Sequence, residues 1–131
     1  MGIEVLVAED DPSWKNFYKL LKSEHVNVTI EDNLKSAIRS AQTKDFDMYI
    51  TSGCYPACLG AVITPGICYV FYHRIIEMKP DAQVFLVAGH DHGLSYMDAS
   101  PLKMTYIPKK DAHKIIPGFI RTLQGKKAEK Q

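Results

Sequence analysis

The chain alternates short apolar runs with longer segments whose apolar residues recur at helical spacing. The first run, residues 3–8 (IEVLVA), consists mostly of β-branched residues and leucine, a composition typical of a buried strand. Comparable runs follow at residues 26–30, 46–51, 84–88 and 104–107. Strands that alternate with helices predict an α/β fold, a five-stranded parallel sheet with helices on both faces.

The segments between these runs carry helix signals. Asp11-Pro12 supplies an N-cap followed by proline in the first turn. The apolar stripe that comes next is Trp14, Phe17, Tyr18 and Leu21. Thr64-Pro65 predicts the start of a later helix, and Cys68 is expected to pack on that helix's core side. Residues 52–65 contain two glycines and two prolines, so we expect a long loop there.

Composition favours one globular domain. The 131 residues are 46% hydrophobic, enough for a core without disulfides or metal. The formal net charge of +1 gives no case for nucleic acid or an anionic membrane as partner. No apolar run approaches the ~20 residues of a membrane span, and three cysteines favour a reducing, cytoplasmic location. We expect a domain over 1–124 and a basic, flexible C-terminal tail over 125–131.

Polar residues gather where the expected strands end. Glu9 and Asp10 follow the first strand, Ser52 ends the third, and Lys109 follows the fifth. The carboxyl ends of parallel strands meet at one edge of a sheet, where ligands and chemistry collect. No glycine-rich loop follows the first strand, which argues against a dinucleotide or P-loop site.

The order and content of these segments resemble the receiver domain of two-component response regulators. The family's first strand and acidic pair are matched by VLVAEDDPSW, which implies Glu9 and Asp10 at the Mg²⁺-binding positions. The family's third strand is matched by FDMYITS, where Ser52 stands at the place of the phosphorylated aspartate. The resemblance implies a flavodoxin-like (βα)5 receiver topology.

The last two strands extend the resemblance to the family's switch residues. The fourth strand is matched by VFLVAGHD, which puts Ala88 where the family has threonine or serine. The fifth is matched by YIPKK, which implies Tyr106 as the switch aromatic and Lys109 as the phosphate-sensing lysine. The segment between Ser52 and Ala88 is longer than is usual in the family.

Ser52 changes the chemistry that the resemblance implies. An acyl phosphate needs a carboxylate, and a serine hydroxyl is a poor nucleophile without an activating base. With two carboxylates left, Glu9 and Asp10, Mg²⁺ binding is expected to be weak or absent. We therefore expect an atypical receiver that is not an enzyme. It would bind a protein partner independently of phosphorylation, as a monomer or weak homodimer, while Glu9, Asp10 and Lys109 form a solvated ion cluster.

Two alternatives stay open. Cys54 and Cys58 in the long loop, and His90 and His92 after the fourth strand, could approach one another at the same edge. Thiolate and imidazole suit Zn²⁺, so a zinc site or a Ser/Cys-based switch is possible by composition, although ordinary loop residues explain the pattern as well. The chain could also be the receiver of a longer response regulator with an output domain after Gln131.

The long 52–65 segment itself predicts a binding surface. It carries the unusual residues Cys54, Tyr55, Cys58 and Ile63. Extended loops on a rigid scaffold often hold binding function. A neutral insertion is the competing explanation, since surface loops tolerate insertion at little cost.

Overall fold

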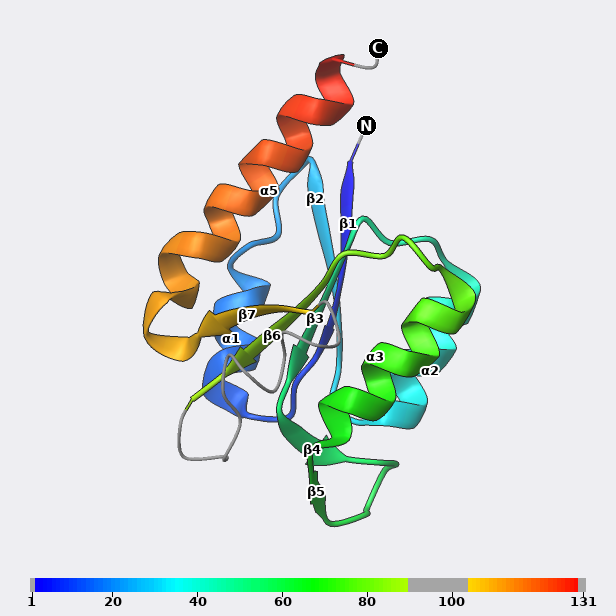
Figure 1. Cartoon of the computed structure of the whole chain (residues 1–131). Coiled ribbons are helices and arrows are strands. Elements are labelled where there is room, and N and C mark those ends of the chain that lie inside the picture. The colour runs from blue at the N-terminus through cyan, green and yellow to red at the C-terminus, as the bar shows by residue number, and fades with distance from the viewer. Residues whose placement is uncertain (1, 90–103, 130–131) are drawn as a thin grey trace.

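A five-stranded parallel sheet forms the centre of the computed structural model, which describes residues 2–89 and 104–129 (Figure 1). The strand order is β2-β1-β3-β6-β7, and every neighbouring pair is parallel. The strands are β1 (Ile3–Ala8), β2 (Val26–Glu31), β3 (Met48–Ser52), β6 (Val84–Ala88) and β7 (Thr105–Pro108). The predicted α/β fold is therefore confirmed.

Helices cover both faces of this sheet (Figure 1). One face holds α1 (Pro12–Lys19) and α5 (Ala112–Glu129), and the other holds α2 (Leu34–Thr43) and α3 (Ile67–Met78). Successive side chains of β1 alternate between the two cores, with Val5 and Val7 facing α1 and α5 and Leu6 facing α2 and α3. Burial on both faces explains why the strand reads as a continuous apolar run.

The helix starts agree only in part with the sequence signals. Asp11 caps α1 as predicted, because its Oδ1 accepts hydrogen bonds from the backbone N–H groups of Ser13 (2.8 Å) and Trp14 (3.4 Å). The predicted cap at Thr64-Pro65 is wrong, since α3 begins at Ile67 after Gly66. Gly66 adopts a φ of 74°, a left-handed conformation that glycine reaches without strain. Cys68 is fully buried, as expected.

Residues 54–65 form a β-hairpin rather than the predicted long loop. Strand β4 (Cys54–Pro56) pairs antiparallel with β5 (Ile63–Pro65), and the hairpin lies beyond the carboxyl end of β3 (Figure 1). Tyr55 anchors it: the side chain is fully buried, and its hydroxyl lies 2.9 Å from Thr51 Oγ1. The exposed apolar residues of the hairpin are Leu59, Val62 and Ile63.

The C-terminal segment also differs from the expected flexible tail. Helix α5 continues to Glu129, so residues 125–129 belong to the fold. Lys127 fixes this end, with Nζ 3.0 Å from Asp47 Oδ2 and 2.8 Å from the carbonyl oxygen of Gly2. The two termini lie at the same end of the molecule (Figure 1).

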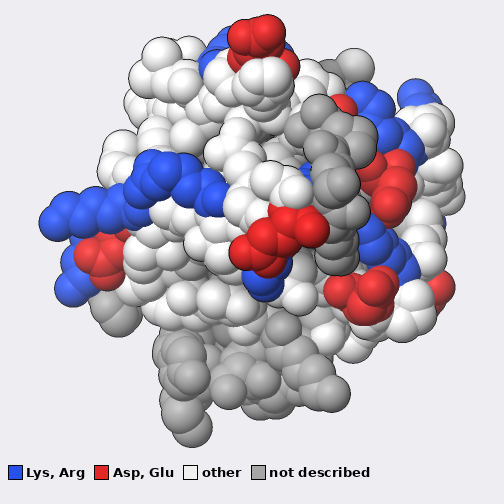
Figure 2. All heavy atoms as spheres, turned by 90° about the horizontal axis from the view of Figure 1, so that it is seen from above, with Lys and Arg blue, Asp and Glu red and all other residues white. Residues whose placement is uncertain are grey.

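Charge on that end is mixed. Figure 2, which views it, shows basic and acidic side chains beside one another rather than in separate patches. Such a surface offers no single-sign field of the kind that attracts nucleic acid. Within residues 2–89 and 104–129, no helix is long and apolar enough to span a bilayer.

The burial of Tyr55 yields a prediction about stability. Tyr55→Ala should lower the free energy of unfolding by about 3–5 kcal/mol, because it leaves a cavity under the hairpin and removes the partner of Thr51. Leu59→Ala in the same hairpin is the matched control and should change it by less than about 0.5 kcal/mol, since Leu59 is exposed. Urea denaturation measures both. Equal losses in the two variants would contradict this packing.

Candidate functional site

Strand register brings the predicted site residues together. Ala8 pairs with Thr51 across β1 and β3, so Glu9 and Ser52 emerge side by side. On the other side, β6 pairs with both β3 and β7 and carries the register across to Lys109. A cavity of about 290 Å³ results, lined by Glu9, Asp10, Asp11, Pro12, Ser52, Cys54, Ile63 and Lys109. The predicted meeting of these residues at the carboxyl edge is thus observed.

Glu9 is the most perturbed group of this cavity. It is only 2% exposed, and its Oε2 accepts hydrogen bonds from the backbone N–H groups of Asp10 (3.0 Å) and Asp11 (3.2 Å). Its Oε1 is buried without a hydrogen-bond partner among the described residues. Burial raises the pKa of Glu9 to about 7, and the Asp11 N–H and the Lys109 charge offset this only in part. The carboxyl group is therefore poised to exchange a proton near neutral pH.

Lys109 contacts an aromatic ring as well as the cavity. Its Nζ lies 5.7 Å from the centre of the Trp14 ring, within the range of a cation–π interaction. The ion pairs of the described residues do not include one between Lys109 and Asp10, so the expected ion cluster is not closed by direct contact. The helical spacing of Trp14 predicts its place in the apolar stripe but not its contact with Lys109. A large aromatic residue four positions after the acidic pair was the available signal.

Ser52 is buried in the wall of the cavity, 5% exposed. Its carbonyl oxygen accepts a hydrogen bond from Thr51 Oγ1 at 2.8 Å. The hydrogen bonds of the described residues do not include one from the Ser52 hydroxyl to Glu9 or Asp10. The hydroxyl therefore lacks the base contact that nucleophilic activation requires.

Tyr106 is tied directly to the backbone of β6. Its hydroxyl donates a hydrogen bond to the carbonyl oxygen of Ala88 at 3.0 Å, and its half-buried ring packs against the core on the α2 and α3 side. Alanine offers no side-chain hydroxyl, yet its main chain supplies the contact. This contact involves a backbone carbonyl oxygen, so the residue type at position 88 gives no sign of it.

Only the two cysteines of the proposed zinc set lie within the described residues. Cys54 lines the cavity and Cys58 is exposed on the hairpin, whereas His90 and His92 fall outside the described residues. Over residues 2–89 and 104–129, no group of three or more histidine, cysteine, aspartate or glutamate side chains is placed to hold a metal ion. Burial raises the pKa of the Cys68 thiol to about 12, which keeps it protonated in the core.

The acidic residues of the cavity determine whether it can hold Mg²⁺. Glu9 has an unsatisfied Oε1, and Asp10 also lines the cavity, whereas Ser52 stands where the resemblance implies a third acidic ligand. A raised pKa further weakens Glu9 as a ligand, since the proton competes with the cation. These residues do not fit a tight Mg²⁺ site.

Comparison with known proteins identifies the fold through structure alone. No family model and no curated protein matches the sequence. Solved structures do match. A response regulator receiver domain protein from Clostridium thermocellum superposes with a TM-score of 0.71 at 17% identity, over 98% of this chain and 99% of that one.

Two further matches come from signalling proteins. The response regulator TrrA, solved in complex with the histidine kinase ThkA, gives a TM-score of 0.68 at 19% identity over 92% of this chain and 97% of that one. A redox sensor of the streptococci, described as evolved from two-component response regulators, gives 0.73 at 16% identity over 99% of this chain and 55% of that one. At these identities the likeness establishes a receiver-type, flavodoxin-like fold.

The buried Glu9 predicts a pH-dependent stability. Its pKa is about 7 in the folded chain against an ordinary value of 4.5 for glutamate, so the folded state holds the proton more tightly. Its favourable contribution is complete below about pH 4.5 and is lost as pH rises to about 7, a loss of about 3 kcal/mol. Relative to the wild type, Glu9→Gln should therefore gain stability between about pH 4.5 and about pH 7.

The comparison requires urea denaturation without divalent cations, with Glu24→Gln as the control because Glu24 is exposed. If the difference in unfolding free energy between the wild type and Glu9→Gln stays constant over this pH range, burial does not raise the pKa of Glu9.

Proposed function

We propose that this chain is a receiver-type signalling module that binds a protein partner without being phosphorylated, and that it is not an enzyme. The observation that carries the proposal is Ser52 at the end of β3, in the cavity with Glu9, Asp10 and Lys109. In the receiver fold this is the place of the acceptor carboxylate. The Ser52 hydroxyl is buried and has no hydrogen bond to a base among the residues that the structure describes, so it does not replace that carboxylate.

The contact between Tyr106 and Ala88 supports independence from phosphate. In the resembling family the switch aromatic responds to phosphate through a threonine or serine side chain. Here the Ala88 carbonyl oxygen holds the Tyr106 hydroxyl at 3.0 Å, a bond that needs no ligand in the cavity. A ligand shifts a conformational equilibrium only when it interacts differently with the two states. We infer that the surface around Tyr106 stays in one arrangement.

The hairpin supports a role in binding. Its strands are anchored by the buried Tyr55, while Leu59 is 87% and Val62 83% exposed. Large apolar side chains this exposed on a rigid element favour a protein contact. One structural neighbour was solved bound to a histidine kinase, which makes a protein partner reasonable for this fold. We propose a cytoplasmic module, monomeric or weakly dimeric.

A thiol switch is the second candidate. Cys54 lies in the wall of the same cavity as Lys109, and a structural neighbour is described as a redox sensor. Treatment with hydrogen peroxide, followed by intact mass and tryptic mapping, tests it. Stoichiometric oxidation at Cys54 that alters partner binding would favour this function over the first.

The central proposal predicts that acetyl phosphate with Mg²⁺ adds no phosphoryl group to the wild type, because Ser52 cannot form an acyl phosphate. Ser52→Asp, the matched variant, restores the carboxylate and should gain a hydroxylamine-labile adduct. Intact-mass spectrometry reads both. A stoichiometric, hydroxylamine-labile phosphoryl adduct on the wild type would contradict the proposal.

The same cavity predicts weak Mg²⁺ binding. Ser52→Asp should bind Mg²⁺ at least about tenfold more tightly than the wild type, because it returns a third oxygen ligand. The fluorescence of Trp14, whose ring contacts Lys109 beside the cavity, is a suitable readout. Saturation of the wild type well below millimolar Mg²⁺ would contradict the two-carboxylate site.

A further inference from the structure

A cluster of positive charge lies between α2 and α3, away from the cavity at the sheet edge. Lys35 and Arg39 from α2 and Arg74 from α3 line one cavity of about 320 Å³. All three side chains are exposed, and no acidic residue lines this cavity. None of them joins an ion pair within the described part of the chain. Three unneutralised cations are a marked local excess in a chain of net charge +1.

The cavity has apolar walls between its charges. Leu34 and Ile38 of α2 contribute one wall, and Ala57 of the hairpin closes the end. The Ala57 carbonyl oxygen accepts a hydrogen bond from the Lys35 backbone N–H at 2.9 Å, so the hairpin is fixed to the first turn of α2. Just beyond Ala57, the hairpin exposes Leu59. A cationic pocket and an apolar projection therefore adjoin on one rigid surface.

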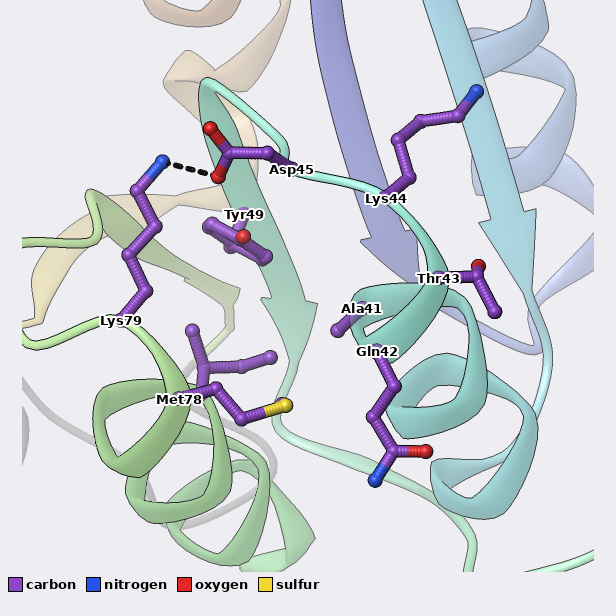
Figure 3. Close-up of a pocket in the computed structure, with 9 residues that line it drawn as sticks. Ala41, Gln42, Thr43, Lys44, Asp45, Tyr49, Met78 and Lys79 are labelled. Atoms are coloured by element: carbon purple, nitrogen blue, oxygen red, sulfur yellow. Dashed lines mark hydrogen bonds and ion pairs between the residues drawn. The ribbon is translucent and has the colours of Figure 1, made fainter.

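This pocket continues along the two helices. Gln42 lines it and also lines a second cavity of about 400 Å³, which reaches Tyr49 and Lys79 (Figure 3). At that end Lys79 Nζ lies 2.8 Å from Asp45 Oδ1, so its charge is already neutralised. The free charge is concentrated at the hairpin end of an elongated groove. Such a shape suits a chain segment better than a single small anion.

We propose that this groove binds an acidic segment of a protein partner. Aspartate or glutamate side chains of that segment would face Lys35, Arg39 and Arg74, and an adjacent apolar side chain would pack on Leu59 and Val62. The inference rests on the proposed function, for which it names the surface and the kind of partner. Complementary charge steers association and selects the partner, and it needs nothing from Ser52.

Fluorescence anisotropy tests the groove with a short labelled peptide in which glutamate pairs alternate with leucine. The full chain is titrated at low ionic strength. The double variant Arg39→Glu/Arg74→Glu should weaken binding at least about fivefold, because two attractive contacts become repulsive. The control Lys114→Glu/Arg121→Glu makes the same change in net charge at exposed positions of α5. It should change the affinity for the peptide less than about twofold, because charges far from the groove act on the peptide only through screened, long-range electrostatics.

Four outcomes would contradict the proposed groove. Three of them are no binding of the peptide, equal weakening by the two double variants, and equal binding of a peptide with glutamine in place of glutamate. The fourth is full competition by millimolar inorganic phosphate, which would indicate a small-anion site. The test is independent of phosphorylation at Ser52. Loss of the groove in a chain that acetyl phosphate does not phosphorylate would remove only this surface. A stoichiometric phosphoryl group on the wild-type chain, with an intact groove, would remove only the proposed function.

Discussion

The pairing register of the parallel strands is the constraint on which the rest of this structure depends. Ala8 opposite Thr51, and Ala88 opposite Pro108, bring residues from distant parts of the sequence to one edge. A shift of one residue would send every buried side chain of a strand to the opposite face. Five of the six residues of β1 and all five of β3 are buried, so such a shift would disrupt the packing on both faces of the sheet. The site is therefore as well fixed as the core.

Burial then determines the chemistry of that edge. Glu9 loses solvation without gaining a close cation, because Lys109 contacts the Trp14 ring and acts on the carboxyl only at longer range. Ser52 contributes no charge. The cavity at this edge is lined by Asp10 and Asp11 together with Glu9, whose carboxyl group readily takes a proton. These features support the proposal of a binding module that is not phosphorylated.

The sequence predicted most of the sheet because buried strands and amphipathic helices leave strong periodic signals. It also predicted the meeting of Glu9, Ser52 and Lys109, since parallel strands end together. It did not predict the hairpin, because each strand has only three residues and the anchoring contact is a single hydrogen bond between Tyr55 and Thr51. Such contacts depend on tertiary geometry.

Two further differences have the same origin. The end of α5 appeared to be a solvated tail by composition, but the ion pair of Lys127 with Asp47 holds it against the start of β3. The hydrogen bond from the Tyr106 hydroxyl is accepted by the backbone carbonyl oxygen of Ala88. Every residue has such a carbonyl group, so the amino-acid sequence does not predict this contact. The basic groove between α2 and α3 likewise needs the packing of two helices distant in sequence. Patterns of residues predict elements and edges, whereas contacts between elements appear only in the structure.

The response of the cavity to beryllofluoride, an analogue of a phosphoryl group, would show whether the chain retains a phosphoryl switch. Amide and tyrosine-ring NMR spectra are recorded with Mg²⁺ while beryllofluoride is added. The signals of Ser52, Ala88 and Tyr106 should not move, because the acceptor carboxylate is missing and the Tyr106 hydroxyl already binds the Ala88 carbonyl oxygen. A saturable shift of these three signals together would show a working phosphoryl switch and contradict a phosphorylation-independent module.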